Sequence, residues 1–261
     1  MRSHAEPIFV WPVVLRDAVA WEPLLAEDER QRARQFRRTE DSATYVACRG
    51  VLRVLLGGFL GRDPASLRFI YGAHEKPLLD DGACAFNVSH SNGLALIAIA
   101  ASGRLGIDVE RIRSDVDVDA LAEEFLAPSH RAALAALPRS ARMAAFFRLW
   151  VRHEARVKAT GRGLVVPAQD DATGEDGHGS WVRDLEIGPG CAAALAADGP
   201  EDRPVFMQPP ARDVHVWLPE TLETGGSAGQ YGRAHLARMT EGGRRCRPPG
   251  LQHRTEELHV R

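Results

Sequence analysis

Two carboxylates stand two residues apart in the stretch LGIDVERI, residues 105–112. Successive side chains of a strand point to opposite faces, so Asp108 and Glu110 would share one face while the β-branched residues beside them face a core. Like charges this close repel each other, and a bound metal ion is a common way to keep both ionised. Taken alone, the stretch favours a half-exposed strand with a solvated acidic face, and a third ligand elsewhere would favour the metal.

A third acid stands in the segment FFRLWVRHEARVKATGRGL, residues 146–164, which has the pattern of a helix. Trp150, Glu154 and Lys158 are spaced four residues apart, so a carboxylate and an ammonium project together from one stripe. An exposed Glu–Lys pair, worth only about 0.2–0.5 kcal/mol, is the alternative. The large apolar residues around the pair indicate a partly enclosed helix, and the sequence leaves the two interpretations equally supported.

Small polar residues cluster in FNVSHSNG, residues 86–93. Ser89, His90 and Ser91 are expected at a strand-to-turn junction, where hydroxyls, an imidazole and free backbone N–H groups can contact a phosphate. An ordinary turn histidine is the alternative. The chain has no G-x-x-x-x-G-K-[ST] loop and no strand–G-x-G-x-x-G–helix fingerprint, which argues against P-loop and Rossmann enzymes. Phosphate chemistry assisted by a metal is the leading hypothesis.

These residues sit in a chain that alternates predicted strands and helices. A strand is predicted over residues 7–15, and helix in two pieces over residues 22–60. Consecutive strands are predicted over residues 84–112, with SNG and ASGR as turns between them. An antiparallel meander is the natural arrangement of such strands.

The second half repeats this mixture of elements. A helical segment over residues 119–137, interrupted at Pro128, precedes a longer helix over residues 140–161, with Ser140 as its N-cap and Gly161 as its stop. Two strand-like segments follow, SWVRDLEI and CAAALAA. Regular patterning then ends near position 205, and we expect a flexible tail after it. The arginines of this tail could bind an acidic partner, but a solvated tail is better supported.

The composition is that of an ordinary globular protein, with 44% hydrophobic and 26% charged residues among 261. The net charge of −2, with arginines far more numerous than lysines, suggests local phosphate sites and argues against nucleic acid as the main partner. The N-terminus lacks signal-peptide features, and the longest apolar run is far shorter than the ~20 residues that span a bilayer. We therefore expect a cytoplasmic protein without a membrane partner. Four scattered cysteines indicate reduced thiols.

The segments HEKPLL, FNVSHSNGLALIAIA, GIDVERI and FFRLWVRHEARVKATGRGL occur in this order along the chain. Together they resemble the 4′-phosphopantetheinyl transferases of the longer, surfactin-synthetase-activating (Sfp) type, over residues 24–196. The resemblance implies an α+β fold: a monomeric pseudo-dimer of two similar α/β subdomains, each a small antiparallel sheet packed with a long helix. We place the nucleotide-side subdomain at residues 1–103, the metal and catalytic subdomain at 104–205, and the tail at 206–261.

The resemblance also implies a reaction. Such enzymes transfer the 4′-phosphopantetheine group from coenzyme A to a serine of an acyl or peptidyl carrier protein and release adenosine 3′,5′-bisphosphate. Asp108, Glu110 and Glu154 would bind one Mg²⁺, or Mn²⁺, as oxygen ligands. The catalytic residues would be Asp108, Glu154 and Lys158. Lys158 would neutralise charge on the phosphate oxygens, and Glu154 is the candidate general base for the carrier serine.

For the nucleotide end of coenzyme A, the resemblance implies that a loop at Lys76 and Pro77 surrounds the adenosine. It also implies that Ser89 and His90 contact phosphate. The basic candidates for the 3′-phosphate are Arg32, Arg34, Arg49 and Arg53, for which solvated arginines are the alternative.

Carrier recognition would use the surface around residues 123–134. Phe125 and Leu126 there are either apolar contacts for the carrier or buried core. The sequence does not indicate whether a fatty-acid, polyketide or nonribosomal-peptide synthase supplies the carrier.

Three positions depart from the pattern of the family. His153 stands where Lys is usual, Val151 replaces Ser or Thr, and Glu75 replaces the Gly before Lys-Pro. The alternative function is therefore a catalytically weak module that binds coenzyme A or a carrier protein. A metal-dependent pyrophosphatase is a third hypothesis. Retention of all three acids and of Lys158 favours the transferase.

Overall fold

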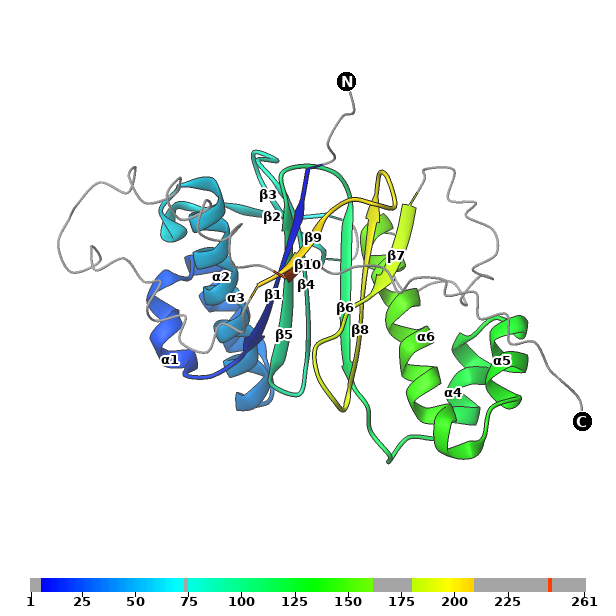
Figure 1. Ribbon diagram of the computed structural model, residues 1–261. Coiled ribbons are helices and arrows are strands. Elements are labelled where there is room, and N and C mark those ends of the chain that lie inside the picture. Colours follow the sequence, from blue (N-terminus) through cyan, green and yellow to red (C-terminus); the bar gives the residue numbers. More distant parts are fainter. Residues whose placement is uncertain (1–5, 73–74, 162–179, 209–243, 246–261) are drawn as a thin grey trace, which may run out of the picture.

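The structure is a computed structural model that describes residues 6–72, 75–161, 180–208 and 244–245 of the chain. It has the expected α+β architecture, in which small sheets are flanked by helices. Figure 1 shows the helices of the first half on one side of the sheets and those of the second half on the other. The division into two similar subdomains stays a prediction.

The first half contains helices and strands in mixed order. They are β1 (Ile8–Val14), α1 (Ala18–Trp21), η1 (Glu22–Leu24), α2 (Glu27–Gln35), α3 (Thr39–Leu60), η2 (Pro64–Ser66), β2 (Phe69–Tyr71), β3 (Pro77–Leu79), β4 (Ala85–Ser91) and β5 (Leu94–Ala100). The strand predicted over residues 7–15 and the two helical pieces within residues 22–60 are therefore confirmed.

The second half begins with the strand that carries two of the acids. Its elements are β6 (Leu105–Arg111), α4 (Val118–Phe125), α5 (Pro128–Ala135), α6 (Arg139–Thr160), β7 (Ser180–Asp184), β8 (Cys191–Asp198), β9 (Val205–Met207) and β10 (Arg244–Arg245). The interruption predicted at Pro128 is confirmed, because α5 begins there with the proline in its first turn.

The larger sheet has the strand order β10-β9-β1-β5-β4. Strand β1 pairs antiparallel with β5 and parallel with β9, and β4 and β5 form a hairpin. Asn92 and Gly93 close the hairpin with φ angles of 48° and 78°, the positive values that a type I′ turn requires. The turn predicted at SNG is confirmed.

The predicted meander ends at β5, which corrects our expectation for the next strand. Strand β6 leaves the larger sheet and forms a second sheet in the order β6-β8-β7. Its antiparallel partner β8 places Ala197 opposite Leu105 and Cys191 opposite Arg111. Apolar and alternating residues indicate a strand but not its partner, so this distant pairing could not be deduced from the sequence.

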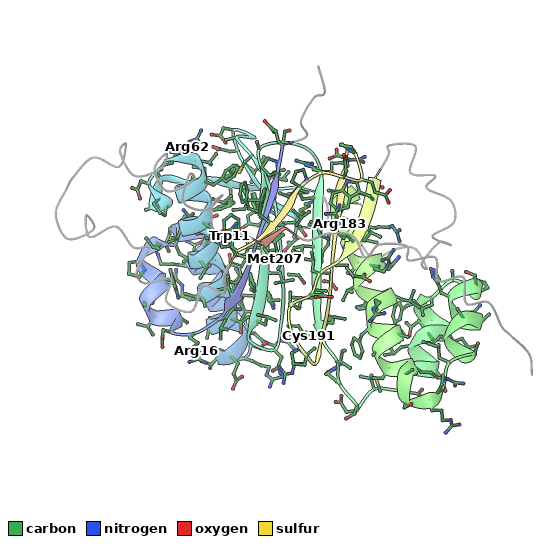
Figure 2. The ribbon with its side chains drawn as sticks, viewed as in Figure 1. Trp11, Arg16, Arg62, Arg183, Cys191 and Met207 are labelled. Carbon is green, nitrogen blue, oxygen red and sulfur yellow. The ribbon has the colours of Figure 1, made fainter. Side chains whose placement is uncertain are left out.

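Both faces of β1 are buried, which explains its continuous apolar run IFVWPVV. Phe9 and Trp11 belong to a core cluster shared with α3, whereas Ile8 and Val10 belong to a second cluster shared with β6 and β8. Figure 2 labels Trp11 in the first of these clusters and Met207, which packs against the second. The larger sheet therefore lies between the first helices and the smaller sheet.

Helix α3 is long and apolar enough, by length and composition, to cross a membrane. However, 61% of its most apolar window is buried inside the protein. Its apolar residues pack against β1 and β5 in the first core cluster. This is how the core helix of a folded domain behaves.

Helix α6 ends as predicted but begins differently. Gly161 ends it in the left-handed conformation, with φ of 69° and its N–H bonded to the Val157 carbonyl. The predicted N-cap, Ser140, is wrong: the helix starts one residue earlier after Pro138, and within the described residues no side chain caps this end. A proline before the first turn fixes the entry of the chain without a hydroxyl.

Helix α6 lies directly on β6 because of a glycine. A Cβ atom added to Gly106 would stand 1.9 Å from the carbonyl oxygen of Ala155 and 2.3 Å from the backbone nitrogen of Ala159. Only a residue without a side chain permits this approach. Gly106 thus sets the distance between the strand and the helix that carry the acids.

The ordered sheet extends past position 205, where the tail was expected to begin. Phe206 stacks on Phe9 with ring centroids 5.6 Å apart, and Gln208 donates its N–H to the Val10 carbonyl at 2.9 Å. Residues 206–208 therefore belong to the sheet, which a three-residue strand without periodicity did not reveal. Apart from β10, the rest of the predicted tail lies outside the described residues.

Candidate functional site

The structure brings Asp108, Glu154 and Lys158 together where α6 lies on β6. Asp108 is 3% exposed and Glu154 is 8% exposed. The Lys158 Nζ donates to Oδ1 of Asp108 at 2.6 Å. Glu110, on the same strand as Asp108, is half-buried. We call Asp108, Glu110 and Glu154 the acid cluster.

Ser89 of β4 is hydrogen-bonded to Asp108 and Lys158 of this site. Its Oγ donates to Oδ1 of Asp108 at 2.8 Å. It accepts from Lys158 Nζ at 3.0 Å and from the N–H of Val109 at 3.3 Å. A serine hydroxyl has one donor and two acceptor positions, so all three are used. The phosphate contact expected for Ser89 would have to replace one of these bonds.

His90 lies on the other face of β4. The strand-to-turn junction expected here is confirmed, because β4 ends at Ser91 and the turn begins at Asn92. Alternation along the strand therefore directs His90 away from Ser89. Desolvation and then Lys158 lower the pKa of His90, while Asp41 of α3 acts in the opposite direction. A phosphate contact of His90 stays a prediction.

The environment of Glu154 disfavours its negative charge. Burial, followed by Asp108 and then by Glu110, raises the pKa of Glu154 from 4.5 to about 7, and Lys158 offsets part of this rise. Its Oε1 atom is buried and has no hydrogen-bond partner among the described residues. A carboxyl with a pKa near neutrality can give and take a proton at physiological pH.

Glu110 is held by a second serine of β4. Ser91 donates its hydroxyl to Oε2 of Glu110 at 2.8 Å. Desolvation raises the pKa of Glu110, the Ser91 bond lowers it, and the nearby Asp108 raises it further. The charge of Asp108 thus raises the pKa of both of the other acids.

The donor set of the acid cluster fits a hard cation such as Mg²⁺. Asp108 Oδ2 and Glu154 Oε1 are buried oxygens without hydrogen-bond partners in the described part of the chain. Buried polar atoms are normally bonded, and unpaired carboxylate oxygens are what a magnesium ion takes up. As they stand, the described residues contain no group of three acidic, histidine or cysteine side chains close enough to form a metal centre.

Lys76 joins the two halves of the molecule. Its Nζ donates to the Leu105 carbonyl at 3.0 Å and to the Lys158 carbonyl. Burial, and then the neighbouring Arg104 and Lys158, lower the pKa of Lys76 to about 8. The Lys76 ammonium is therefore already hydrogen-bonded near the end of α6. Pro77, the next residue, is the first residue of strand β3. Their contact with adenosine stays a prediction.

Arg53 and Arg49 share one buried acid, Glu29 of α2. Arg53 is 1% exposed and donates Nε to Oε2 of Glu29 at 2.8 Å, and its Nη1 is bonded to two backbone carbonyls. Arg49 Nε lies 3.3 Å from Oε1 of Glu29, and Arg49 Nη2 donates to the Tyr71 hydroxyl at 3.1 Å. This geometry favours a structural role for Arg53 over the phosphate contact expected from the sequence.

Arg32, one of the arginines considered for the 3′-phosphate, lines a pocket. Its guanidinium lies over the rings of Tyr71 and Tyr45, at 5.3 and 5.9 Å from their centroids, and is bonded to Glu75. Arg32, Tyr71 and Glu75 line an open pocket of about 450 Å³ together with Phe36 and polar residues of α2. Arg34, by contrast, makes an exposed pair with a glutamate of its own helix.

The expected carrier-docking residues differ in exposure. Leu126 is 3% exposed and belongs to the core formed by α4 and α6, so for this residue the buried alternative is correct. Phe125 is half-buried and meets the Trp150 ring edge-on at a centroid distance of 5.0 Å. Trp150 supports α4 from the same helix that carries Glu154.

Two functional features escaped the sequence reasoning. Gly106 controls the approach of α6, and Asn87 and Ser91 flank Ser89 on one face of β4. The alternation N-x-S-x-S in FNVSHS was the available signal, since every second residue of a strand shares a face. Without knowledge of the neighbouring strand, this alternation indicates only a local cluster of polar residues that could contact a phosphate.

The segment that holds the acid cluster also has known relatives. Residues 104–199, from before β6 to the end of β8, match the 4′-phosphopantetheinyl transferase superfamily. The three residues of the acid cluster and Lys158 all lie within this matched range.

Individual 4′-phosphopantetheinyl transferases match a longer part of the chain. HetI of Nostoc sp. is 40% identical over 144 residues, which cover 54% of this chain and 61% of HetI. AcpT of Salmonella typhimurium is 34% identical over 110 residues, or 42% of this chain and 56% of AcpT. Sfp of Bacillus subtilis is 26% identical over 194 residues, or 68% of this chain and 85% of Sfp. The chain thus spans less than two thirds of the length of HetI.

Proposed function

We propose that this protein transfers the 4′-phosphopantetheine group of coenzyme A to a serine of an apo acyl or peptidyl carrier protein. The observation that carries the proposal is the pair of buried acids Asp108 and Glu154 with Lys158 bonded to Asp108, inside the segment that matches the 4′-phosphopantetheinyl transferase superfamily. The names of the relatives HetI and Sfp support the same reaction. We further propose a cytoplasmic monomer, on the composition and motifs alone.

Glu154 is the group suited to accept the proton of the carrier serine. In the metal-free protein its pKa is about 7, so both the carboxylate and its conjugate acid are accessible near neutral pH. The serine oxygen forms a bond to the β-phosphorus of coenzyme A, and the bond from that phosphorus to the oxygen bridging to the α-phosphate breaks. Adenosine 3′,5′-bisphosphate leaves with the bonding electrons.

Lys158 supplies the positive charge for the phosphate oxygens. Its side chain is 29% exposed and its ammonium is bonded to Asp108 and Ser89, so the charge is held in one place on a side chain that solvent still reaches. A preorganised cation costs no reorganisation when negative charge develops. Asp108 thereby positions Lys158 as well as offering an oxygen of its own.

Asp108, Glu110 and Glu154 are the residues that would hold Mg²⁺ or Mn²⁺. A divalent cation in this position would add its charge to that of Lys158 in neutralising the pyrophosphate. The two buried, unpaired oxygens of Asp108 and Glu154 support this assignment.

A second candidate function is a module that binds coenzyme A or a carrier protein without turnover. The bond from Arg32 to Glu75 favours it, since the acid occupies a guanidinium beside the open pocket. The full set of acids and Lys158 argues for turnover, because binding alone does not require a general base.

The test is mass spectrometry of apo carrier proteins of the acyl and peptidyl types, incubated with this protein, coenzyme A and Mg²⁺. We expect the mass of one phosphopantetheine group to be added to the carrier, and EDTA to prevent it. Glu154→Gln should abolish the addition, whereas Glu186→Gln, which alters an exposed acid, should not. Binding of coenzyme A without addition to any carrier would favour the binding module, and coenzyme A hydrolysis without a carrier would favour a pyrophosphatase.

A further inference from the structure

Strands β4 and β6 are neighbours that belong to different sheets. Side chains, rather than a backbone ladder, connect them in the described structure. Three residues of β4 at alternate positions each accept a hydrogen bond from an alternate amide of β6: Asn87 Oδ1 from Ile107 at 2.8 Å, Ser89 Oγ from Val109 at 3.3 Å and Ser91 Oγ from Arg111 at 3.1 Å. We call these three bonds the β4–β6 seam.

The seam provides hydrogen-bond acceptors for the backbone amides on the edge of β6 that does not pair with β8. One edge of this strand pairs with β8, so the amides of the other edge need partners when they are buried. Ile107 is fully buried and Asn87 is 6% exposed, so the bond between them is shielded from water. Because the bonds recur every second residue, they fix the register of β6 against β4.

Two of the seam residues have a second task. Ser89 donates its hydroxyl to Asp108, and Ser91 donates its hydroxyl to Glu110, each at 2.8 Å. In both pairs the acid immediately precedes the residue whose amide the same serine accepts. The amide fixes the position of the hydroxyl oxygen relative to β6, and the remaining hydrogen is then directed at the acid. Asn87, at the other end of the seam, accepts from the Ile107 amide and makes no hydrogen bond to an acid among the described residues.

The hydrogen bond from a seam serine restricts the side chain of Glu110 more than that of Asp108. Asp108 is buried and also bonded to Lys158, whereas Glu110 is half-buried with a longer side chain and more rotamers. The Ser91 bond engages Oε2 of Glu110 and leaves Oε1 for a ligand. Partners that orient the ligands of a metal in this way commonly contribute 10- to 100-fold to its affinity.

We propose that Ser91 is a positioning residue: through one hydroxyl it ties β6 to β4 at Arg111 and holds the carboxylate of Glu110 in place for a divalent cation. The proposal rests on the proposed function, since it assumes that the acid cluster binds a metal. It assigns Ser91 a role in the geometry of the site and no contact with the reacting atoms.

The test compares Ser91→Ala with Ser91→Thr, which restores a hydroxyl, and with Asn87→Ala, which opens the same seam at an end that touches no acid. Amide hydrogen exchange of the full chain reports the seam. Electron paramagnetic resonance with Mn²⁺, with and without coenzyme A, reports the metal.

We expect Ser91→Ala to speed exchange of the Arg111 amide and to weaken Mn²⁺ binding by about 10-fold. Ser91→Thr should keep both near those of the unaltered protein. Asn87→Ala should speed exchange of the Ile107 amide and leave Mn²⁺ binding unchanged. Ser102→Ala is a second control, outside the seam, because it removes an exposed hydroxyl bonded to Glu6 at 3.3 Å and should change neither readout.

Unchanged Mn²⁺ binding in Ser91→Ala would overturn the proposal, as would equal weakening by Asn87→Ala, which would mark a general effect of loosening the seam. Absence of Mn²⁺ binding in the unaltered protein would overturn it as well. Neither readout uses a carrier protein. A protein that shows the expected responses but modifies no carrier would therefore refute the proposed function and leave the role of Ser91 standing.

Discussion

The ammonium of Lys158 lies 2.6 Å from the carboxylate of Asp108, although the two residues are 50 positions apart in the chain. Asp108 lies on β6 and Lys158 on α6, and Gly106 lets these elements touch. The pair holds a positive charge beside Glu154, whose own ionisation is disfavoured by its acidic neighbours. One predicted consequence concerns stability against pH.

Without metal, Glu154 should make the protein less stable as the pH rises. Its pKa is about 7 in the folded protein and 4.5 as a model value, so the folded state binds the proton more tightly. Stability is therefore fully present below pH 4.5, is lost as the pH rises through 7, and falls by about 3 kcal/mol in total. Urea unfolding in EDTA from pH 4 to 8 should show this fall, and Glu154→Gln should remove most of it. An equal slope in both proteins would contradict the assignment.

Gly106→Ala should displace α6 from β6. The added methyl group would meet backbone atoms, which cannot move aside as a flexible side chain can. We expect a loss of about 3 kcal/mol, at the upper end of overpacking effects, together with loss of transfer activity. Gly58→Ala in α3 is the matched control, because a Cβ there meets nothing within 4 Å and should stabilise the helix by about 0.5–1 kcal/mol. Similar unfolding midpoints for the two variants would refute the role of Gly106.

Arg53→Ala should damage the fold rather than the selectivity for coenzyme A. Removing Arg53 leaves Glu29 buried, at 1% exposure, with the Arg49 guanidinium as the remaining charge beside it and the Ala26 N–H as a neutral donor at 2.8 Å. Breaking such a pair typically costs about 3–5 kcal/mol. Arg34→Ala, which opens an exposed pair, should cost less than about 1 kcal/mol.

A kinetic measurement on Arg53→Ala separates this role from the phosphate contact expected from the sequence. A contact with the 3′-phosphate predicts a raised KM for coenzyme A but not for 3′-dephospho-coenzyme A. We expect both KM values to change alike, so a selective rise would restore the original assignment.

Glu75→Gly should tighten coenzyme A binding. Glu75 has a φ of 59°, which costs a residue with a side chain about 1–2 kcal/mol, and its carboxylate occupies Arg32. The exposed ion pair between Arg32 and Glu75 contributes less than about 1 kcal/mol to the stability of the fold, so the glycine variant should not be less stable. Glu75→Gln keeps the strained backbone but removes the charge. If coenzyme A affinity, measured by calorimetry, rises in neither variant, Glu75 does not compete for the nucleotide site.

The sequence by itself determined the residues that carry the chemistry. The alternation in GIDVE and the four-residue spacing of Glu154 and Lys158 are local, since each depends only on how one strand or one helix directs its side chains. The α+β class, most of the elements and the SNG turn were readable for the same reason. The resemblance to the transferase family agrees with the match of residues 104–199 to that superfamily.

The tertiary structure alone decided which elements meet. The sequence could not show that β6 pairs with β8, that Ser89 and Ser91 face the acids while His90 faces away, or that Arg53 is enclosed with Glu29. These contacts join residues far apart in the chain, and hydrophobic burial selects among many arrangements with the same local patterns. The sequence thus indicates what chemistry a polar side chain can perform, but which residue it contacts is determined only when the sheets and helices pack.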